Sequence, residues 1–355
     1  MNIETPVLII GGGPVGLALS IELGWRGVDC VMVERRDGSV GHPKMNQVGN
    51  RTQEFCRRWG IGQKVRELSI PEDFPRNIIF HTNLSGHELG RYEFPARQDV
   101  VQPYSPEFMQ RCSQIWFDPL LRDFAGELPS VTQMFNTQLD RFDADQGGVT
   151  AYVTDQNSGA EQIVRAQYMV ACEGAESRVR DELGIDLVGD HGLSFNINIF
   201  FKSTDSDVLF SKGRAVMQWF FDETGLWADI VSINGKDLWR LSIMKLPAGT
   251  EITEAAGADY LRKAAGTDLE FEILSILPWD RKRVVAERYH EGRIFLAGDA
   301  VHQMSPTGGF GMNTGIQEAV DIGWKLAAVL DGWGGDNLLR TYDLERRPVA
   351  RMITD

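Results

Sequence analysis

The chain has 355 residues, of which 43% are hydrophobic and 24% are charged, a balance typical of globular proteins rather than disordered or fibrous ones. Its net charge of −14 argues against binding to nucleic acid or to an anionic membrane surface, because both need clustered Lys and Arg. The apolar run near the N-terminus follows Glu4 and is broken by glycines, so it does not resemble a signal peptide. With no apolar run long enough to span a bilayer, a cytoplasmic location is the default expectation.

Cysteines and histidines are spread along the chain without a metal-like grouping. No Cys-x-x-Cys pair occurs, and the four cysteines stand far apart, at Cys30, Cys56, Cys112 and Cys172. We therefore expect buried thiols in a reducing compartment and no metal site.

The first forty residues predict a strand, a helix and a second strand. The apolar run PVLII is followed by the turn GGGPVG, and a helix then extends to Gly27, a residue type that closes helices. The run VDCVMVE gives the second strand. Strand, helix and strand in this order favour a right-handed crossover and a parallel pair.

Later segments alternate between helical and strand patterns. We expect a helix over residues 50–68, a hairpin over 77–94, a helix over 112–124 and strands within 138–170. Between about residues 184 and 279, aromatic and β-branched residues alternate with polar ones, which predicts an antiparallel sheet interrupted by a helix near 255–265. Helical periodicity returns after the run RIFLAGDA.

This pattern predicts an α/β protein with two domains. A Rossmann-like nucleotide-binding domain is expected to comprise residues 1–72, 106–184 and 281–355. An inserted antiparallel sheet domain, suited to binding a substrate, is expected to comprise residues 73–105 and 185–280.

A Gly-x-Gly-x-x-Gly motif lies where the first strand ends and the first helix begins. Gly11 permits the tight turn, Gly13 lets the backbone approach a pyrophosphate, and Gly16 lets helix and strand pack closely. Glu34 ends the second strand, where its carboxylate can accept hydrogen bonds from ribose hydroxyls. An acid there disfavours a 2′-phosphate, so the ligand should be FAD or NAD. The neighbouring residues assigned to this site are Pro14, Val15 and Arg35.

Three motifs in order resemble the flavoprotein aromatic hydroxylases, the class A FAD-dependent monooxygenases of the p-hydroxybenzoate hydroxylase type. They are GGGPVG with VER, then CEGAESRVR, then GRIFLAGDAVHQMSPTGGFGMNTGIQEAVDIGWKL. The resemblance spans nearly the whole chain. It implies that the nucleotide-binding domain is a glutathione-reductase-like FAD-binding domain.

The resemblance also implies roles for the third motif. Asp299 would hold a ribityl hydroxyl of FAD, and Pro306, Gly308 and Gly309 would lie near the reactive ring. The helix beginning near residue 312 would direct its N–H groups at the flavin N1–C2 edge, where reduced flavin carries negative charge. The cofactor residues implied here are Gly298, Asp299, Pro306, Gly309, Gly311, Met312 and Asn313.

Two shorter segments resemble the same family. Gln114, with Asp118 four residues on, resembles a Gln-x-x-x-Glu helix whose Gln contacts the cofactor, and Lys44 stands where a basic residue approaches the pyrophosphate. Arg51 is a weaker candidate, with a solvated surface charge as the alternative. The sequence departs from the family pattern at Asp118, at Lys44, where Arg is common, and at Glu173, where Asp is usual. In related enzymes the chain often continues beyond the position of Asp355 and sometimes adds a C-terminal domain, and the sequence leaves open whether this chain is trimmed there.

The activity implied is hydroxylation of an aromatic substrate, a phenol being favoured, with NADPH or NADH as electron donor and O2 as co-substrate. Oxygen would react through a flavin C4a-hydroperoxide, so no protein nucleophile is needed. Aromatic residues of the inserted sheet are candidates to line the substrate pocket, with ordinary core packing as the alternative for each: Phe195, Phe201, Trp219, Phe221, Trp227 and Trp239. The sequence does not identify the base that would activate a phenol.

The partners expected are a small aromatic substrate and O2, with a homodimer left open. Alternatives are a related monooxygenase acting on a polycyclic or non-phenolic substrate, such as an epoxidase or a tetracycline-inactivating enzyme, and a flavin-binding protein without turnover. A halogenase is disfavoured because the run WDRKR does not match its tryptophan motif. No nucleophile elbow or P-loop occurs, and the disulfide-reductase flavoproteins would need an early cysteine pair.

Overall fold

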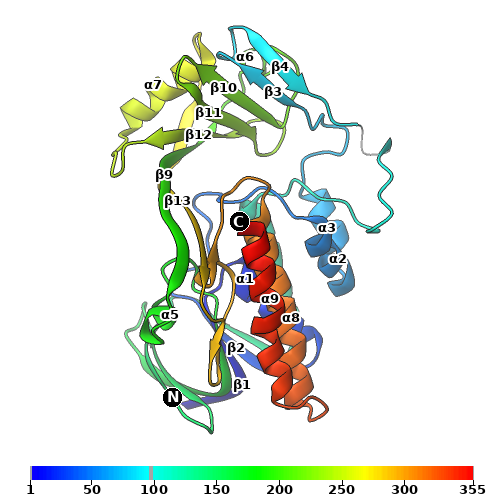
Figure 1. The fold of residues 1–355 in the computed structure, drawn as a ribbon, viewed down its shortest axis with the longest axis vertical. Coiled ribbons are helices and arrows are strands. Elements are labelled where there is room, and N and C mark those ends of the chain that lie inside the picture. The colour runs from blue at the N-terminus through cyan, green and yellow to red at the C-terminus, as the bar shows by residue number, and fades with distance from the viewer. Residues whose placement is uncertain (1, 96–98, 355) are drawn as a thin grey trace.

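Two eight-stranded sheets dominate the computed structural model, which describes residues 2–95 and 99–354 (Figure 1). The lower sheet follows the order β14-β15-β8-β1-β2-β5, and β7 pairs with the start of β8 and with β6. Its strands are β1 (Asn2–Ile10), β2 (Cys30–Val33), β5 (Val131–Met134), β6 (Thr137–Ala144), β7 (Val149–Asp155), β8 (Glu161–Ala171), β14 (His290–Glu291) and β15 (Ile294–Leu296).

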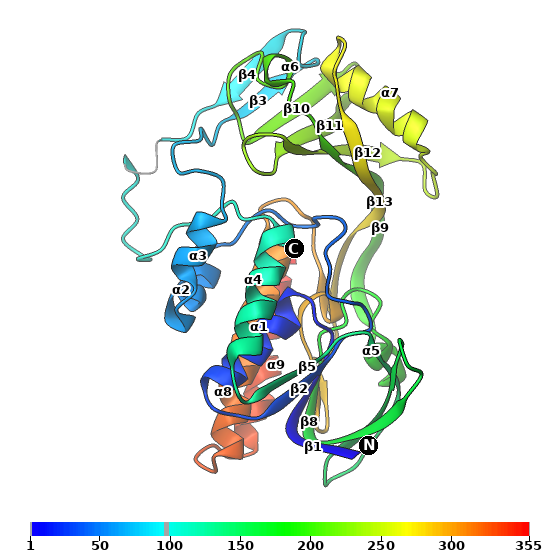
Figure 2. The same cartoon turned by 180° about the vertical axis from the view of Figure 1, so that it is seen from behind.

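Helices cover one face of the lower sheet. α4, α1, α8 and α9 lie side by side in that layer, with α4 in front in Figure 2 and α9 in front in Figure 1. Helices in the described residues are α1 (Pro14–Trp25), α2 (Asn50–Trp59), α3 (Gly62–Glu67), α4 (Gln114–Glu127), α5 (Arg178–Glu182), α6 (Ser206–Leu209), α7 (Glu254–Ala265), α8 (Phe310–Leu330), α9 (Asn337–Thr354) and the 3-10 turn η2 (Gly298–Ala300). The predicted strand-helix-strand unit is present, with β1 and β2 parallel.

The upper sheet follows the order β16-β13-β9-β12-β11-β10-β3-β4. Its strands are β3 (Ile78–His81), β4 (Glu88–Tyr92), β9 (Leu187–Lys202), β10 (Met217–Asp222), β11 (Gly225–Ser232), β12 (Leu238–Leu246), β13 (Glu272–Ala286) and β16 (His302–Gln303). Every neighbouring pair is antiparallel, as expected, except β3 with β10, which are parallel.

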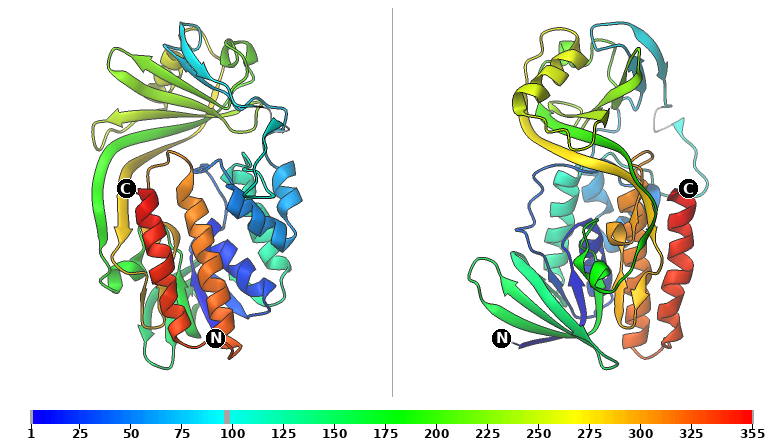
Figure 3. Two further views of the ribbon diagram at one scale, coloured as in Figure 1. Left: turned by 45° about the vertical axis from the view of Figure 1, so that its right-hand side comes forward. Right: turned by 60° about the vertical axis from the view of Figure 1, so that its left-hand side comes forward.

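The long strands β9 and β13 run from the upper sheet down beside the lower layer (Figure 3). The predicted domain boundary at 280/281 therefore falls within a continuous strand, and the domain limits remain a prediction. α7 packs on one face of the upper sheet, where a second hydrophobic core forms. No helix among the described residues is long and apolar enough to cross a membrane.

The helix predicted over residues 50–68 is wrong in one respect, because the structure has two helices there. α2 ends at Gly60, which adopts the left-handed conformation with φ of +91°. α3 begins two residues later. A glycine with positive φ ends a helix in this way, although the apolar spacing continues through the break.

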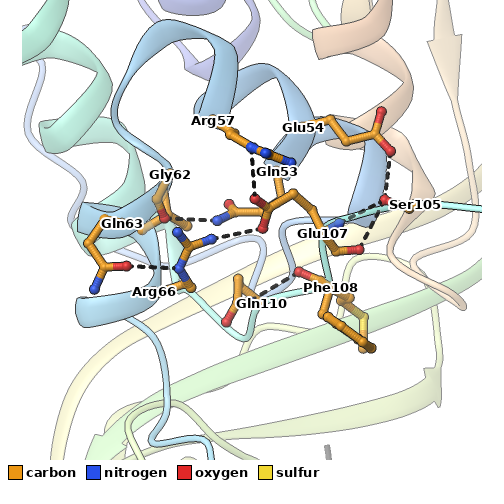
Figure 4. Close-up of polar contacts among 12 residues, drawn as sticks. Gln53, Glu54, Arg57, Gly62, Gln63, Arg66, Ser105, Glu107, Phe108 and Gln110 are labelled. Carbon is orange, nitrogen blue, oxygen red and sulfur yellow. Dashed lines mark hydrogen bonds and ion pairs between the residues drawn. The ribbon is translucent and has the colours of Figure 1, made fainter. Parts of the chain in front are cut away.

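The segment that leads into α4 is fastened to α2 and α3 (Figure 4). Buried Glu107 accepts a hydrogen bond of 2.8 Å from Arg66, and the Ser105 hydroxyl donates to Glu54 over 2.6 Å. Backbone bonds then join residues 48 and 110 in both directions. These contacts position Arg111 and the start of α4 between the two sheets.

Candidate functional site

The first glycine-rich loop is shaped by two close approaches and one open position. A Cβ on Gly16 would lie 1.9 Å from the Gly11 carbonyl oxygen, and one on Gly11, where φ is +105°, would lie 2.4 Å from the Cys172 carbonyl oxygen. A Cβ on Gly13 would meet no protein atom within 4 Å. Gly13 also caps α1 without a side chain, so the first N–H groups of that helix face an open position. This arrangement fits a pyrophosphate at the helix N-terminus.

Glu34, which was predicted to bind the ribose of the cofactor, is held in place by backbone N–H groups. Its two carboxylate oxygens accept hydrogen bonds from the backbone N–H groups of Gly12, over 2.7 Å, and Arg36, over 2.9 Å. Each oxygen retains a further lone pair, so a ribose hydroxyl can still be bound. Arg35 is exposed, and its charge lies close enough to Glu173 to favour ionisation of that carboxyl.

The second motif, CEGAESRVR, contacts the third motif, which contains Asp299. Burial raises the pKa of Glu173, whose carboxylate accepts hydrogen bonds from the Ser177 hydroxyl, over 2.7 Å, and the Val179 N–H, over 3.1 Å. Buried Arg180 donates to the Ala175 carbonyl oxygen over 3.1 Å and to the Ala300 carbonyl oxygen over 3.3 Å. Arg180, to which the sequence assigned no role, therefore ties the second motif to the turn that contains Asp299.

Asp299 lies on the 3-10 turn η2, directly after β15. Its side chain is exposed, yet the surrounding protein raises the pKa of its carboxyl, while the charges of His302 and Lys44 oppose that shift. The turn packs tightly, since a Cβ on Gly298, where φ is +70°, would lie 2.9 Å from Val15 on α1. Asp299 is thus a surrounded but accessible acceptor, as a ribityl site would require.

Lys44, Gln114 and Asp118 form a connected chain beside this turn. The Lys44 backbone N–H donates to the Gln114 side-chain oxygen over 3.0 Å, and the Gln114 amide nitrogen donates to Asp118 over 2.9 Å. Burial raises the pKa of Asp118 to about 7, and the bond from Gln114 opposes that rise. Asp118 therefore orients Gln114 despite being shorter than the usual Glu. Arg51 is mostly exposed and pairs with Glu54 on the surface of α2.

The loop from Pro306 to Gly309 leads into α8. Pro306 and Gly308 are exposed, and Gly308 and Gly309 have φ of +89° and +68°. Gly309 caps α8 without a side chain, and no acid stands in the first helical turn, so the N–H groups of Gly311 and Met312 are suited to an anionic partner.

The side chain of Asn313 is engaged within the protein. Its oxygen accepts from the Gly49 N–H and the Thr52 hydroxyl, both over 2.7 Å. Its nitrogen donates to the Gln47 and Gly309 carbonyl oxygens over 3.1 and 2.7 Å. Asn313 therefore fastens α8 to the start of α2, and only its backbone remains for a cofactor contact.

A buried pair behind the Asp299 turn was missed in the sequence. Glu318 on α8 and His302 are both fully buried, with 3.1 Å between His302 Nε2 and Glu318 Oε2. The same oxygen accepts the Gly298 N–H over 2.9 Å. Although burial opposes protonation, the Glu318 charge leaves the pKa of His302 raised. The two residues are sixteen positions apart and a loop lies between them, so no local pattern in the sequence indicates the pair.

Replacing Glu318 with Gln should lower the free energy of unfolding by about 3 kcal/mol at pH 6, because a buried His302 loses its charged partner. The raised pKa of His302 gives stability that is present below its unfolded value, near 6.5, and is lost as pH rises through the folded value. The loss should therefore be smaller at pH 9. Urea unfolding at both pH values measures it, and an equal loss at both would contradict the charged pair.

The predicted aromatic pocket residues divide between the two faces of the upper sheet. Phe201 and Trp227 are buried in the core beside α7, and so is Trp239, whereas Phe195 packs at its edge. Trp227 lies there because of a β-bulge: Phe220 pairs with Ala228 and Phe221 with Leu226, so the pairing skips Trp227. This placement favours the alternative of ordinary core packing for Phe201 and Trp227.

Trp219 and Phe221 both contact Phe80 on β3, with ring centroids 5.5 and 6.2 Å apart. Trp219 pairs with Asp229, whose neighbours Ala228 and Ile230 belong to the core beside α7. Trp219 and Asp229 therefore face away from that core. Trp219 and Asp229 are therefore better candidates for contact with a substrate than Phe201 and Trp227, which are buried in the core beside α7.

The residues present fit FAD. Two glycine-capped helix N-termini, an accessible carboxylate at Asp299 and an acid at Glu34 lie in motifs that close packing and hydrogen bonds bring together. No group of three or more His, Cys, Asp or Glu that could hold a metal occurs among the described residues.

Comparison with known proteins agrees with this fit. A 4-methyl-5-nitrocatechol 5-monooxygenase of a Burkholderia species is 34% identical over 100% of this chain and 66% of its own length. A tetracenomycin A2 monooxygenase-dioxygenase of Streptomyces glaucescens is 33% identical over 99% of this chain and 67% of its own length. A solved flavin-dependent monooxygenase, in complex with FAD and substrate, superposes with a TM-score of 0.93 at 30% identity, over 99% of this chain and 62% of that one.

The chain spans only part of its relatives. It covers 64% and 56% of the length of two Streptomyces relatives, from Streptomyces halstedii and Streptomyces coelicolor, that are 38% and 37% identical to it. The profile of the family described as FAD binding domain matches residues 4–355. The chain therefore belongs to the FAD binding domain family, that of the class A flavoprotein monooxygenases and hydroxylases.

Proposed function

We propose that the protein is an FAD-dependent monooxygenase that consumes O2 and NADPH or NADH and hydroxylates an aromatic substrate, with phenols as the favoured class. The observation that carries the proposal is the convergence of two glycine-capped helices and Asp299 on one side of the lower sheet, opposite the face of the upper sheet that carries Trp219 and Asp229. Relatives named for a nitrocatechol and for tetracenomycin A2 support an aromatic substrate.

The protein's part in this reaction is to bind and to orient. The N-terminus of α1 and Lys44 would hold the pyrophosphate of FAD, and Asp299 would accept a ribityl hydroxyl. The N-terminus of α8 would stabilise negative charge on the ring. Bound FAD supplies the redox and oxygen chemistry, so the remaining task of the chain is to place the substrate ring and exclude water.

Purified protein with FAD should show flavin absorption bands and oxidise NADPH or NADH faster when a simple phenol is added, with a hydroxylated product detected by mass spectrometry. Protein that cannot be reconstituted with FAD would overturn the proposal. The second candidate, a polycyclic substrate, predicts stimulation and product with polycycles such as tetracyclines but none with simple phenols. A flavin-binding protein without turnover predicts bound FAD and no stimulation by either class.

A further inference from the structure

Alternate residues of the upper sheet point away from α7, and this side is called the front face below. Phe200 and Val231 on the front face pack against Trp116 of α4. His42 contacts the same face, with its ring centroid 6.2 Å from that of Phe200 and its Nδ1 2.8 Å from the Ser275 hydroxyl. The front face therefore looks toward the segments that carry Lys44 and Gln114, which were assigned to the cofactor.

Asp229 lies in the middle of the front face. It pairs across the strands with Trp219 on β10 and Ser242 on β12. Arg240 stands two residues from Ser242 on β12 and is therefore a diagonal neighbour of Asp229 on the same face. The Asp229 side chain is only 7% exposed. A carboxylate in such a position requires a functional or structural partner.

Polar atoms around Asp229 lack partners among the residues that the structure describes. Asp229 Oδ1 is buried without a hydrogen bond, and so are Trp219 Nε1 and Arg240 Nε on the same face. Across from them, His42 Nε2 and Arg111 Nε are also buried and unbonded. Buried polar atoms are normally paired, so this concentration of unpaired ones indicates a place where a polar ligand binds.

The charge that acts on Asp229 is positive. Arg240 acts on it directly, and Arg111, just before α4, lies within the influence of Arg240. Burial lowers the pKa of Arg111 to about 10, and the charges of Arg76 and Arg240 contribute to that shift. Such an environment stabilises an oxygen anion on a bound ligand.

We propose that Asp229 accepts the hydroxyl proton of a phenolic substrate bound against the front face, and that Arg240 stabilises the resulting phenolate. The O–H bond of the phenol breaks with its electron pair left on oxygen, and a new O–H bond forms on Asp229. The carboxylate becomes a neutral acid, so the net charge of the site is unchanged. This assignment rests on the proposed hydroxylation of phenols.

Asp229 suits this role better than His42, a second titratable acceptor on this side. Burial raises the pKa of Asp229 to about 6, opposed by the charge of Arg240 and by hydrogen bonding with Ser242, which leaves the carboxyl ionised at neutral pH yet more basic than an ordinary carboxylate. Burial lowers the pKa of His42 to about 4, and the charges of Arg240 and Lys44 act in the same direction. His42 is therefore the weaker base.

A series of phenols of increasing acidity tests the assignment in the FAD-loaded protein. Asp229→Asn should reduce the rate of hydroxylation of unsubstituted phenol by roughly 100- to 10,000-fold, the range for loss of a general base. The loss should shrink along the series and become small for 4-nitrophenol, which ionises without help. FAD binding and the binding of 4-nitrophenol, measured by difference absorption, should be retained. Asp222→Asn, the same change at the exposed end of β10, is the control and should leave all rates unchanged.

The outcomes separate the two proposals. An equal loss for every phenol would indicate a structural role and overturn the assignment, as would an Asp229→Asn variant with the wild-type rate. If the wild-type protein with bound FAD hydroxylates no phenol in the series, the proposed function fails, and the role of Asp229 fails with it.

Discussion

Replacing Gly13 with Ala is expected to weaken FAD binding by roughly 5- to 150-fold while the protein stays folded, whereas replacing Gly16 with Ala is expected to destabilise the fold itself. The two positions belong to the same glycine-rich loop, and they differ in what a new methyl group would meet. The pair therefore separates a glycine required by the cofactor from a glycine required by the chain.

The expected effect at Gly13 follows from its open surroundings. Its φ is −75°, which alanine adopts without strain, and a Cβ there would meet no protein atom within 4 Å. Alanine should therefore raise the free energy of unfolding of the FAD-free protein by about 0.4–1 kcal/mol, by restricting the unfolded chain. If the pyrophosphate lies against this residue, the methyl group costs about 1–3 kcal/mol of steric strain, which gives the stated loss of affinity.

At Gly16 the obstacle is the protein. A Cβ would lie 1.9 Å from the carbonyl oxygen of Gly11, which is backbone and cannot rotate away. The first turn of α1 would have to separate from β1, with a loss of about 3 kcal/mol or more in unfolding free energy. Urea unfolding without FAD and fluorescence titration with FAD measure the two effects. A Gly13→Ala variant that binds FAD as tightly as wild type would exclude the pyrophosphate from this position.

The elements that the sequence predicts well are those with local causes. The turn at Gly11 and the loop at Gly308 and Gly309 have positive φ, so their glycines mark them directly. The strand-helix-strand unit at the N-terminus follows from apolar runs on either side of that turn. The helix break at Gly60 has the same local cause, but it was missed because the apolar spacing of α2 continues into α3.

Site features that depend on pairing between distant strands could not be predicted. Trp227 faces α7 because a β-bulge reverses the alternation of side chains between the two faces of β11. No residue type in that strand predicts the bulge. Asp229 becomes notable only when Trp219 and Ser242 are paired beside it. Likewise, the sequence around Glu318 indicates only an ordinary helical residue. Its contact with the Gly298 N–H depends on where α8 packs in the folded protein.

Replacing Asp229 with Asn is expected to stabilise the protein at neutral pH while removing its proposed function. Burial raises the folded-state pKa of Asp229 from its ordinary value of 3.8 to about 6. Well below pH 3.8 the carboxyl is neutral in both states. Between pH 4 and 6 the unfolded chain ionises first, so the folded wild-type protein loses stability as pH rises. Above pH 6 the full difference between the two pKa values, about 2–3 kcal/mol at 1.36 kcal/mol per pH unit, destabilises the folded state.

Asparagine has no such ionisation, so the unfolding free energy of Asp229→Asn should exceed that of wild type by up to about 2–3 kcal/mol at pH 7, and this difference should shrink to a small fraction near pH 4. Asp222→Asn is the control with the opposite sign. Hydrogen bonds from Thr224, with Lys263, lower the pKa of Asp222 to about 2, so its ionised form stabilises the folded protein above pH 4. Denaturant unfolding across pH 4 to 7 measures both. A gain in stability together with a loss of function is the trade-off expected for a residue that serves the reaction, so a destabilised Asp229→Asn variant at pH 7 would argue that Asp229 is structural.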